Sequence, residues 1–174
     1  LFTSPPYASN AIDYMRAHKF SLVWFENPLD ELSNLRSKYI GGEKTADYPF
    51  LELPTETTKI ISEIARADEK KGLSLHRYYS EMKRVLSQSL RVLRPGKAAV
   101  FVVGSSTMRG IDTQTQNCIG EIGKSLGFDL VGIATRKLDR DRRMLPASRK
   151  KCRNSQIEDR MYEEYVVALV KPMN

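Results

Sequence analysis

The chain has 174 residues, a formal net charge of +7 and a hydrophobic fraction of 41%. This length suits one domain with a proper core. A charged-then-apolar leader and an apolar run of membrane-spanning length are both missing from the sequence, which argues against secretion and membrane insertion. Cys118 and Cys152 lie far apart, and His18 and His76 stand alone. We therefore expect reduced thiols, no metal site and an intracellular protein.

The first element in chain order is a strand end followed by two prolines. Phe2 to Ser4 are predicted to end a buried strand. Pro5 and Pro6 fix their own φ angles and donate no backbone hydrogen bond, so they predict a stiff, extended loop. Such a loop holds the Ser4 hydroxyl and the Tyr7 ring at a set separation. The alternatives are a proline-rich surface turn or a ligand for a small adaptor domain.

Capping residues and apolar periodicity predict four helices before residue 94. Trp24 and Phe25 are expected to pack in the core, and residues 41–54 to form an irregular loop anchored by Tyr48, Pro49 and Phe50. The polar stretch 68–72 is expected to separate the third helix from the fourth. The predicted helices are Ser9 to Phe25, Pro28 to about Tyr39, a helix capped by Thr55 that carries Ile60, Ile61 and Ile64, and Ser74 to Leu93.

The second part of the chain is predicted to alternate strands with one more helix. Arg94-Pro95-Gly96 stops the long helix, since proline cannot continue it. Residues 98–103 are continuously apolar, which is typical of a strand buried on both faces. Residues 104–106 follow as a mobile polar turn, at the strand end where open α/β sheets bind ligands. The remaining predicted elements are a helix from about Thr113 to Leu126, a Gly127 cap, and strands Phe128 to Thr135 and Glu164 to Val170.

The excess positive charge is confined to residues 136–153, which we call the basic segment. It holds nine bases and two acids, so it accounts for the whole net charge of the chain. An excess segregated in this way predicts contact with nucleic-acid phosphates. A solvated run of charges is the alternative. The nine bases are Arg136, Lys137, Arg140, Arg142, Arg143, Arg149, Lys150, Lys151 and Arg153.

The Ser4-Pro5-Pro6-Tyr7 run resembles the signature of the S-adenosylmethionine-dependent methyltransferases that modify exocyclic amino groups of DNA bases. The resemblance implies that Ser4, Pro5, Pro6 and Tyr7 form the catalytic loop of a cytoplasmic, prokaryote-like enzyme. It implies that Thr3 contacts the cofactor. The serine form is most familiar from cytosine-N4 enzymes. An adenine-N6 or RNA enzyme, and a non-catalytic nucleic-acid-binding relative, are the alternatives.

The order of predicted elements also resembles the second half of the Rossmann-like class I methyltransferase fold. That α/β fold has a mostly parallel sheet, a final antiparallel strand pair, and a last strand inserted beside the strand after the long helix. Such enzymes carry a glycine-rich cofactor loop, whereas Gly-x-Gly occurs nowhere in this sequence. We therefore expect residues 1–174 to form one partial catalytic region. An upstream segment or a second chain would complete the fold. DNA would be the binding partner. The sequence does not decide whether a restriction nuclease accompanies the enzyme.

Overall fold

A single mixed sheet organises the part of the chain that the structure describes. Its strand order is β1-β2-β6-β5, with β1 parallel to β2 and with β6 antiparallel to both β2 and β5. The predicted insertion of the last strand and the antiparallel final pair are confirmed. The strands are β1 (Phe2–Thr3), β2 (Ala98–Gly104), β5 (Asp129–Lys137) and β6 (Glu163–Val170). A computed structural model of the chain describes residues 1–8, 14–26, 28, 30, 32, 39–42, 45–104, 106–137 and 163–173.

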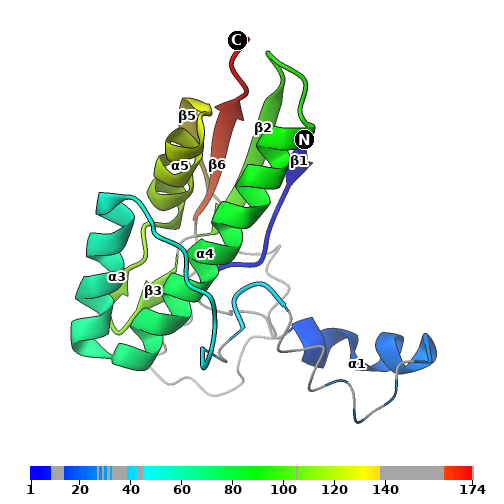
Figure 1. The fold of residues 1–174 in the computed structure, drawn as a ribbon. Coiled ribbons are helices and arrows are strands. Elements are labelled where there is room, and N and C mark those ends of the chain that lie inside the picture. The colour runs from blue at the N-terminus through cyan, green and yellow to red at the C-terminus, as the bar shows by residue number, and fades with distance from the viewer. Residues whose placement is uncertain are drawn as a thin grey trace.

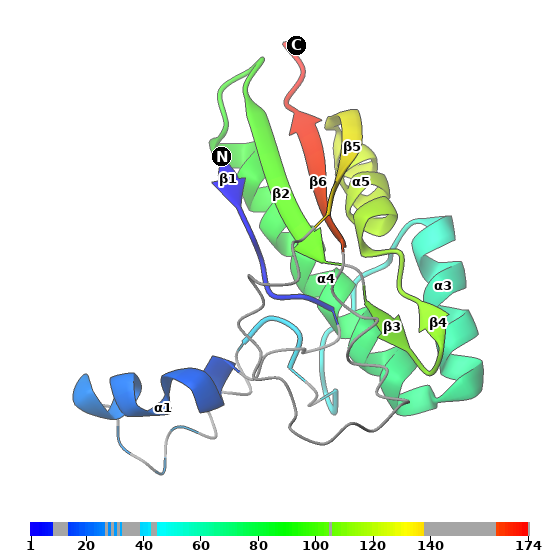
Figure 2. The same cartoon turned by 180° about the vertical axis from the view of Figure 1, so that it is seen from behind.

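Helices cover one face of this sheet. The long helix α4 (Glu69–Val92) and α5 (Thr115–Leu126) lie against it, and α3 (Thr55–Ala67) packs on both helices (Figure 1). Phe101 and Val167 are fully buried between sheet and helices. Figure 2 shows the opposite face, over which the described part of the chain places no helix. None of the described helices is long and apolar enough to cross a membrane.

The start of α3 is capped from another helix. The N-cap position is Pro54, so the prediction that Thr55 caps this helix is wrong. Glu121 of α5 instead accepts hydrogen bonds from the backbone nitrogens of Glu56 at 3.1 Å and Thr57 at 2.8 Å. Burial raises the pKa of the Glu121 carboxyl, but the bonds from Thr57 and Glu56 outweigh it and leave the pKa below its usual value. The carboxylate thus satisfies amide donors that a helix start leaves unpaired.

The long helix α4 begins five residues earlier than its sequence predicts. The Asp68 side chain accepts from the Lys71 nitrogen at 3.1 Å and caps the helix, so neither a Ser74 start nor a polar connection at 68–72 is correct. Gly72 is helical and faces α3, where an added Cβ would lie 2.5 Å from the Cβ of Ala65. The glycine therefore permits close helix packing here. The predicted stop is confirmed, since α4 ends at Val92 and Gly96 in the turn that follows has a φ of +73°.

The loop before α3 is anchored by aromatic side chains, as predicted. Tyr48 and Phe50 form an edge-on pair with ring centroids 5.2 Å apart, and the Phe50 ring lies 4.7 Å from that of His76. Arg84 donates to the Pro49 carbonyl at 2.9 Å. These contacts tie the loop to α4.

The helix after the proline loop, α1 (Tyr14–Trp24), lies apart from the sheet (Figures 1 and 2). Trp24 is 87% exposed and Phe25 is 77% exposed, so the prediction that both pack in the core is wrong. Apolar side chains enter a core only where another element covers them, and none of the described elements covers this helix. Residues 9–13, where the helix was expected to begin, and most of the predicted helix at 28–39 lie outside the described residues.

Four further differences concern the strands and the turn after β2. Phe2 is 74% exposed rather than buried, and β2 is fully buried only on its helix-facing side. Gly104 belongs to β2, and Ser106 is buried and accepts from the Thr113 nitrogen at 2.9 Å, so these two residues do not form the expected mobile turn. Ser105 lies outside the described residues. A short hairpin that the sequence analysis missed follows, formed by β3 (Thr107–Met108) and β4 (Ile111–Asp112).

Candidate active site

The Ser-Pro-Pro-Tyr motif lies at the carboxyl end of β1, beside the carboxyl end of its parallel neighbour β2. Thr3 ends β1 and is half-buried, with Phe101 as its partner in β2. Ser4 follows it and is exposed, whereas Pro5 is buried. The loop therefore fixes its proline in the protein and leaves the serine hydroxyl open to a ligand. Carboxyl ends of parallel strands are where open α/β sheets bind their ligands.

Tyr7 is held by contacts to two strands. Its ring packs over Gly104 at the end of β2, where an added Cβ would lie 2.6 Å from Tyr7 Cε2. Its hydroxyl donates a 2.9 Å hydrogen bond to Glu164 Oε1 in β6, across 157 positions in sequence. The motif is thus attached to the sheet by its last residue as well as by its strand.

Glu164 is a site residue that the sequence analysis missed, whereas Gly104 was expected in a ligand-binding turn and instead lies under the Tyr7 ring. Glu164 also pairs with Arg136 of β5, with 3.9 Å between Oε2 and Nη1. The one signal in the sequence is the acidic pair Glu163-Glu164 at the start of an otherwise apolar strand. Local sequence predicts neither the contact of Tyr7 with Glu164 nor its packing on Gly104, because each contact joins segments about 100 residues or more apart.

The basic segment begins at the same edge of the sheet. Arg136 and Lys137 are exposed residues of β5, so this strand extends two residues beyond its predicted end at Thr135. Arg136 is the register partner of Glu164, which in turn is the partner of Gly104. The seven remaining bases of the segment, from Arg140 to Arg153, lie outside the described residues. The basic segment therefore starts beside Glu164 and Gly104, two residues that contact Tyr7.

Other reactive groups among the described residues do not form a site. Burial raises the pKa of the Cys118 thiol, which is 1% exposed, so little thiolate is available for nucleophilic chemistry. Within the described part of the chain, no group of three or more His, Cys, Asp and Glu side chains is placed to hold a metal ion.

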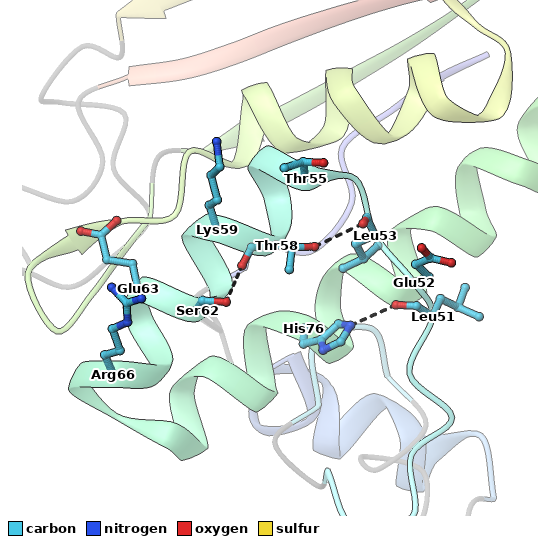
Figure 3. A pocket seen from close by; sticks show the side chains of 10 residues that line it. All are labelled: Leu51, Glu52, Leu53, Thr55, Thr58, Lys59, Ser62, Glu63, Arg66 and His76. Carbon is cyan, nitrogen blue, oxygen red and sulfur yellow. Dashed lines mark hydrogen bonds between the residues drawn. The ribbon is translucent and has the colours of Figure 1, made fainter.

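A concavity lies beside α3, away from the Ser-Pro-Pro-Tyr motif (Figure 3). Its polar groups are used locally: His76 Nε2 bonds the Leu51 carbonyl at 3.0 Å, and Thr58 donates to the Leu53 carbonyl at 3.2 Å. Its two basic and two acidic side chains offset each other in charge. We therefore regard it as a hollow between elements. The lining residues are Leu51, Glu52, Leu53, Thr55, Thr58, Lys59, Ser62, Glu63, Arg66 and His76.

Comparison with curated proteins identifies a sequence relative. The type II methyltransferase M.MvaI of Kocuria varians is 24% identical over 133 residues. The chain is homologous to a type II methyltransferase. The matched region covers 70% of this chain but 29% of the relative, so the chain spans less than a third of that protein's length. No protein-family model matches the sequence.

The matches among solved structures include two structures of a protein of Thermus thermophilus that is assigned as a DNA modification methylase. Its complex with S-adenosyl-L-methionine aligns with a TM-score of 0.42 and 19% identity, over 72% of this chain and 43% of that chain. Its selenomethionine derivative aligns with a TM-score of 0.41 and 20% identity, over 75% of this chain and 49% of that chain.

Proposed function

We propose that this chain carries the catalytic loop of a DNA methyltransferase that uses S-adenosylmethionine and modifies the exocyclic amino group of a base, with cytosine N4 as the target. The observation that carries the proposal is the position of Ser4-Pro5-Pro6-Tyr7, with its serine exposed at the carboxyl ends of two adjacent parallel strands. The homology to a type II methyltransferase supports it. The DNA substrate and the target base are parts of the proposal.

The proposed chemistry is activation of a poor nucleophile by positioned acceptors. The lone pair of an exocyclic amine is conjugated with the ring of its base. The Ser4 hydroxyl oxygen and the Pro5 carbonyl each accept one amine hydrogen, which favours the pyramidal nitrogen. The nitrogen would then take the methyl group that S-adenosylmethionine supplies, as the carbon–sulfur bond of the cofactor breaks, and would lose one proton to solvent. Tyr7 stacks on the base, which is taken out of the duplex. Acceleration comes from positioning and electrostatics, without a covalent enzyme intermediate.

We propose that the described residues meet only the reacting end of the cofactor. When bound, S-adenosylmethionine supplies a methyl group on a positively charged sulfur, which leaves as a neutral thioether. Thr3, half-buried beside the exposed Ser4, is the residue we propose to contact it. Gly-x-Gly, the pattern that would hold the amino-acid end, is absent from the 174 residues. We therefore propose that an upstream segment or a second chain supplies that loop and completes a Rossmann-like fold.

Calorimetry with S-adenosylmethionine tests whether the cofactor needs a loop from outside these 174 residues in order to bind. This chain alone is expected to bind the cofactor weakly or not at all, whereas the complete protein that carries it binds. Micromolar binding by the chain alone would mean that the cofactor site lies within these residues. A complete protein that binds DNA but no cofactor would instead be a non-catalytic nucleic-acid-binding relative.

The basic segment is proposed to hold the phosphate backbone without choosing the sequence. Replacing Lys150 and Lys151 by alanine should weaken binding to all duplexes alike, because phosphate contacts position a protein on DNA and base edges specify the sequence. The salt dependence of binding should become shallower by about 0.9 in log–log slope for each lost contact. Binding is measured over a range of salt, with target and non-target duplexes side by side.

The matched control replaces Lys70 and Lys71, another adjacent lysine pair, which lies at the start of α4. It removes the same charge from outside the basic segment and should leave the slope unchanged. A changed target preference with an unaltered slope for the Lys150 and Lys151 variant would show that the segment reads sequence.

A further inference from the structure

A row of three register partners crosses the sheet beside the proposed catalytic loop. Gly104 of β2 pairs with Glu164 of β6, and Glu164 pairs with Arg136 of β5. Residues paired across strands project to the same face. Because the Tyr7 ring occupies the space above Gly104, this is also the face on which the tyrosine lies.

Tyr7 forms a hydrogen bond with Glu164, the middle residue of this row. This bond is 2.9 Å long and has a carboxylate as its acceptor, and the Glu164 side chain is only 17% exposed. Hydrogen bonds to an ionised acceptor are stronger than neutral ones. The Arg136 ion pair is longer, at 3.9 Å, and the arginine is 61% exposed, so water screens it. Of the two contacts that Glu164 makes to Tyr7 and Arg136, the bond to Tyr7 is therefore the stronger.

Three features of the described structure restrict separate degrees of freedom of Tyr7. Pro5 and Pro6 fix the backbone that leads into the residue. Gly104, which has no side chain, lets the ring lie close to the sheet. The bond to Glu164 then fixes the direction in which the hydroxyl points. A ring held in one orientation presents one face, and a face already in place loses little freedom when it stacks on a base.

We propose that Glu164 is a positioning residue, which holds the Tyr7 ring ready for the target base. This inference rests on the proposed function. Glu164 acts through Tyr7 and does not itself touch the base. Removing either end of the bond should therefore impair base capture to the same extent, and removing both ends should do little further harm.

The experiment compares Tyr7→Phe, Glu164→Ala and the double variant in the complete protein. The readouts are the fluorescence of 2-aminopurine at the target position and the separate values of kcat and KM. Each single variant is expected to lower base capture about tenfold, and the double variant by about the same factor. Glu164→Gln keeps an acceptor oxygen and should restore most of the capture. Unfolding is followed for every variant, since a purely structural contact would change stability without changing capture in the folded protein.

Glu163→Ala is the matched control, because this adjacent carboxylate faces the other side of the strand and lies 3.4 Å from the Tyr165 hydroxyl. It should capture the base as the wild type does. If the wild type transfers methyl groups and Glu164→Ala captures the base equally well, the positioning role is wrong and the proposed function stands. Additive losses in the double variant would also contradict it. If the wild type neither captures a base nor transfers a methyl group, the proposed function fails, and this inference fails with it.

Discussion

Replacing Ser4 by alanine is expected to slow methyl transfer about 100- to 1,000-fold in a protein that stays folded. The hydroxyl is proposed to accept a hydrogen of the reacting amine, and that bond strengthens as the nitrogen becomes pyramidal in the transition state. The loss should therefore appear in kcat more than in KM. Ser4 is exposed at the end of β1, so the change removes no buried contact from the core. Transfer of a labelled methyl group to duplex DNA measures the rate.

Ser62→Ala is the control for this variant. Ser62 is an exposed serine of α3 whose hydroxyl bonds only its own helix in the described structure, at 2.9 Å to the Thr58 carbonyl. It should transfer methyl groups at the wild-type rate. Near-normal turnover by a folded Ser4→Ala variant would remove Ser4 from the mechanism.

Gly72→Ala is expected to lower the free energy of unfolding by on the order of 1–2 kcal/mol. An added Cβ would lie 2.5 Å from the Cβ and 2.7 Å from the Cα of Ala65, so the backbones of α3 and α4 must separate to admit it. Alanine is the better helix former by roughly 0.5–1 kcal/mol. The clash outweighs this gain because it involves the backbone rather than a flexible side-chain end. Urea unfolding followed by circular dichroism measures the difference.

Gly132→Ala is the matched control for crowding. An added Cβ at Gly132 meets no heavy atom within 4 Å, so the free energy of unfolding should stay within about 0.5 kcal/mol of wild type. A Gly72→Ala variant as stable as the wild type would mean that α3 and α4 are farther apart than the structure shows.

The sequence predicts elements well where a local signal decides them. The proline and glycine after α4 end that helix, and the apolar runs near residues 98, 129 and 164 form strands. It fails where two local signals compete. Asp68 and Ser74 are both good caps, and Gly72 between them is typical of a break. Packing against Ala65 decides in favour of a continuous helix. The exposed Trp24 shows that an apolar residue becomes core only where a partner covers it.

The candidate site is predictable only in part for the same reason. The Ser4 to Tyr7 motif is local, so it is readable from the sequence, and its place at a strand end agrees with the prediction. Two residues that contact Tyr7 are Gly104 in β2 and Glu164 in β6, about 100 and 157 positions away. Sequence spacing carries no information on such contacts until the strand order is known. Glu164 therefore became visible only when the sheet placed it beside Gly104.

The proposed function is methyl transfer to an exocyclic amino group of DNA by the loop that this chain carries. Its most direct test is mass spectrometry of nucleosides from duplex DNA, after incubation with the complete protein and S-adenosylmethionine carrying a deuterated methyl group. We expect the wild type to form deuterated N4-methylcytosine and the Ser4→Ala variant to form much less of it. Deuterated N6-methyladenine would keep the enzyme class and correct the base. A folded protein that binds both cofactor and DNA but labels no base would contradict the account.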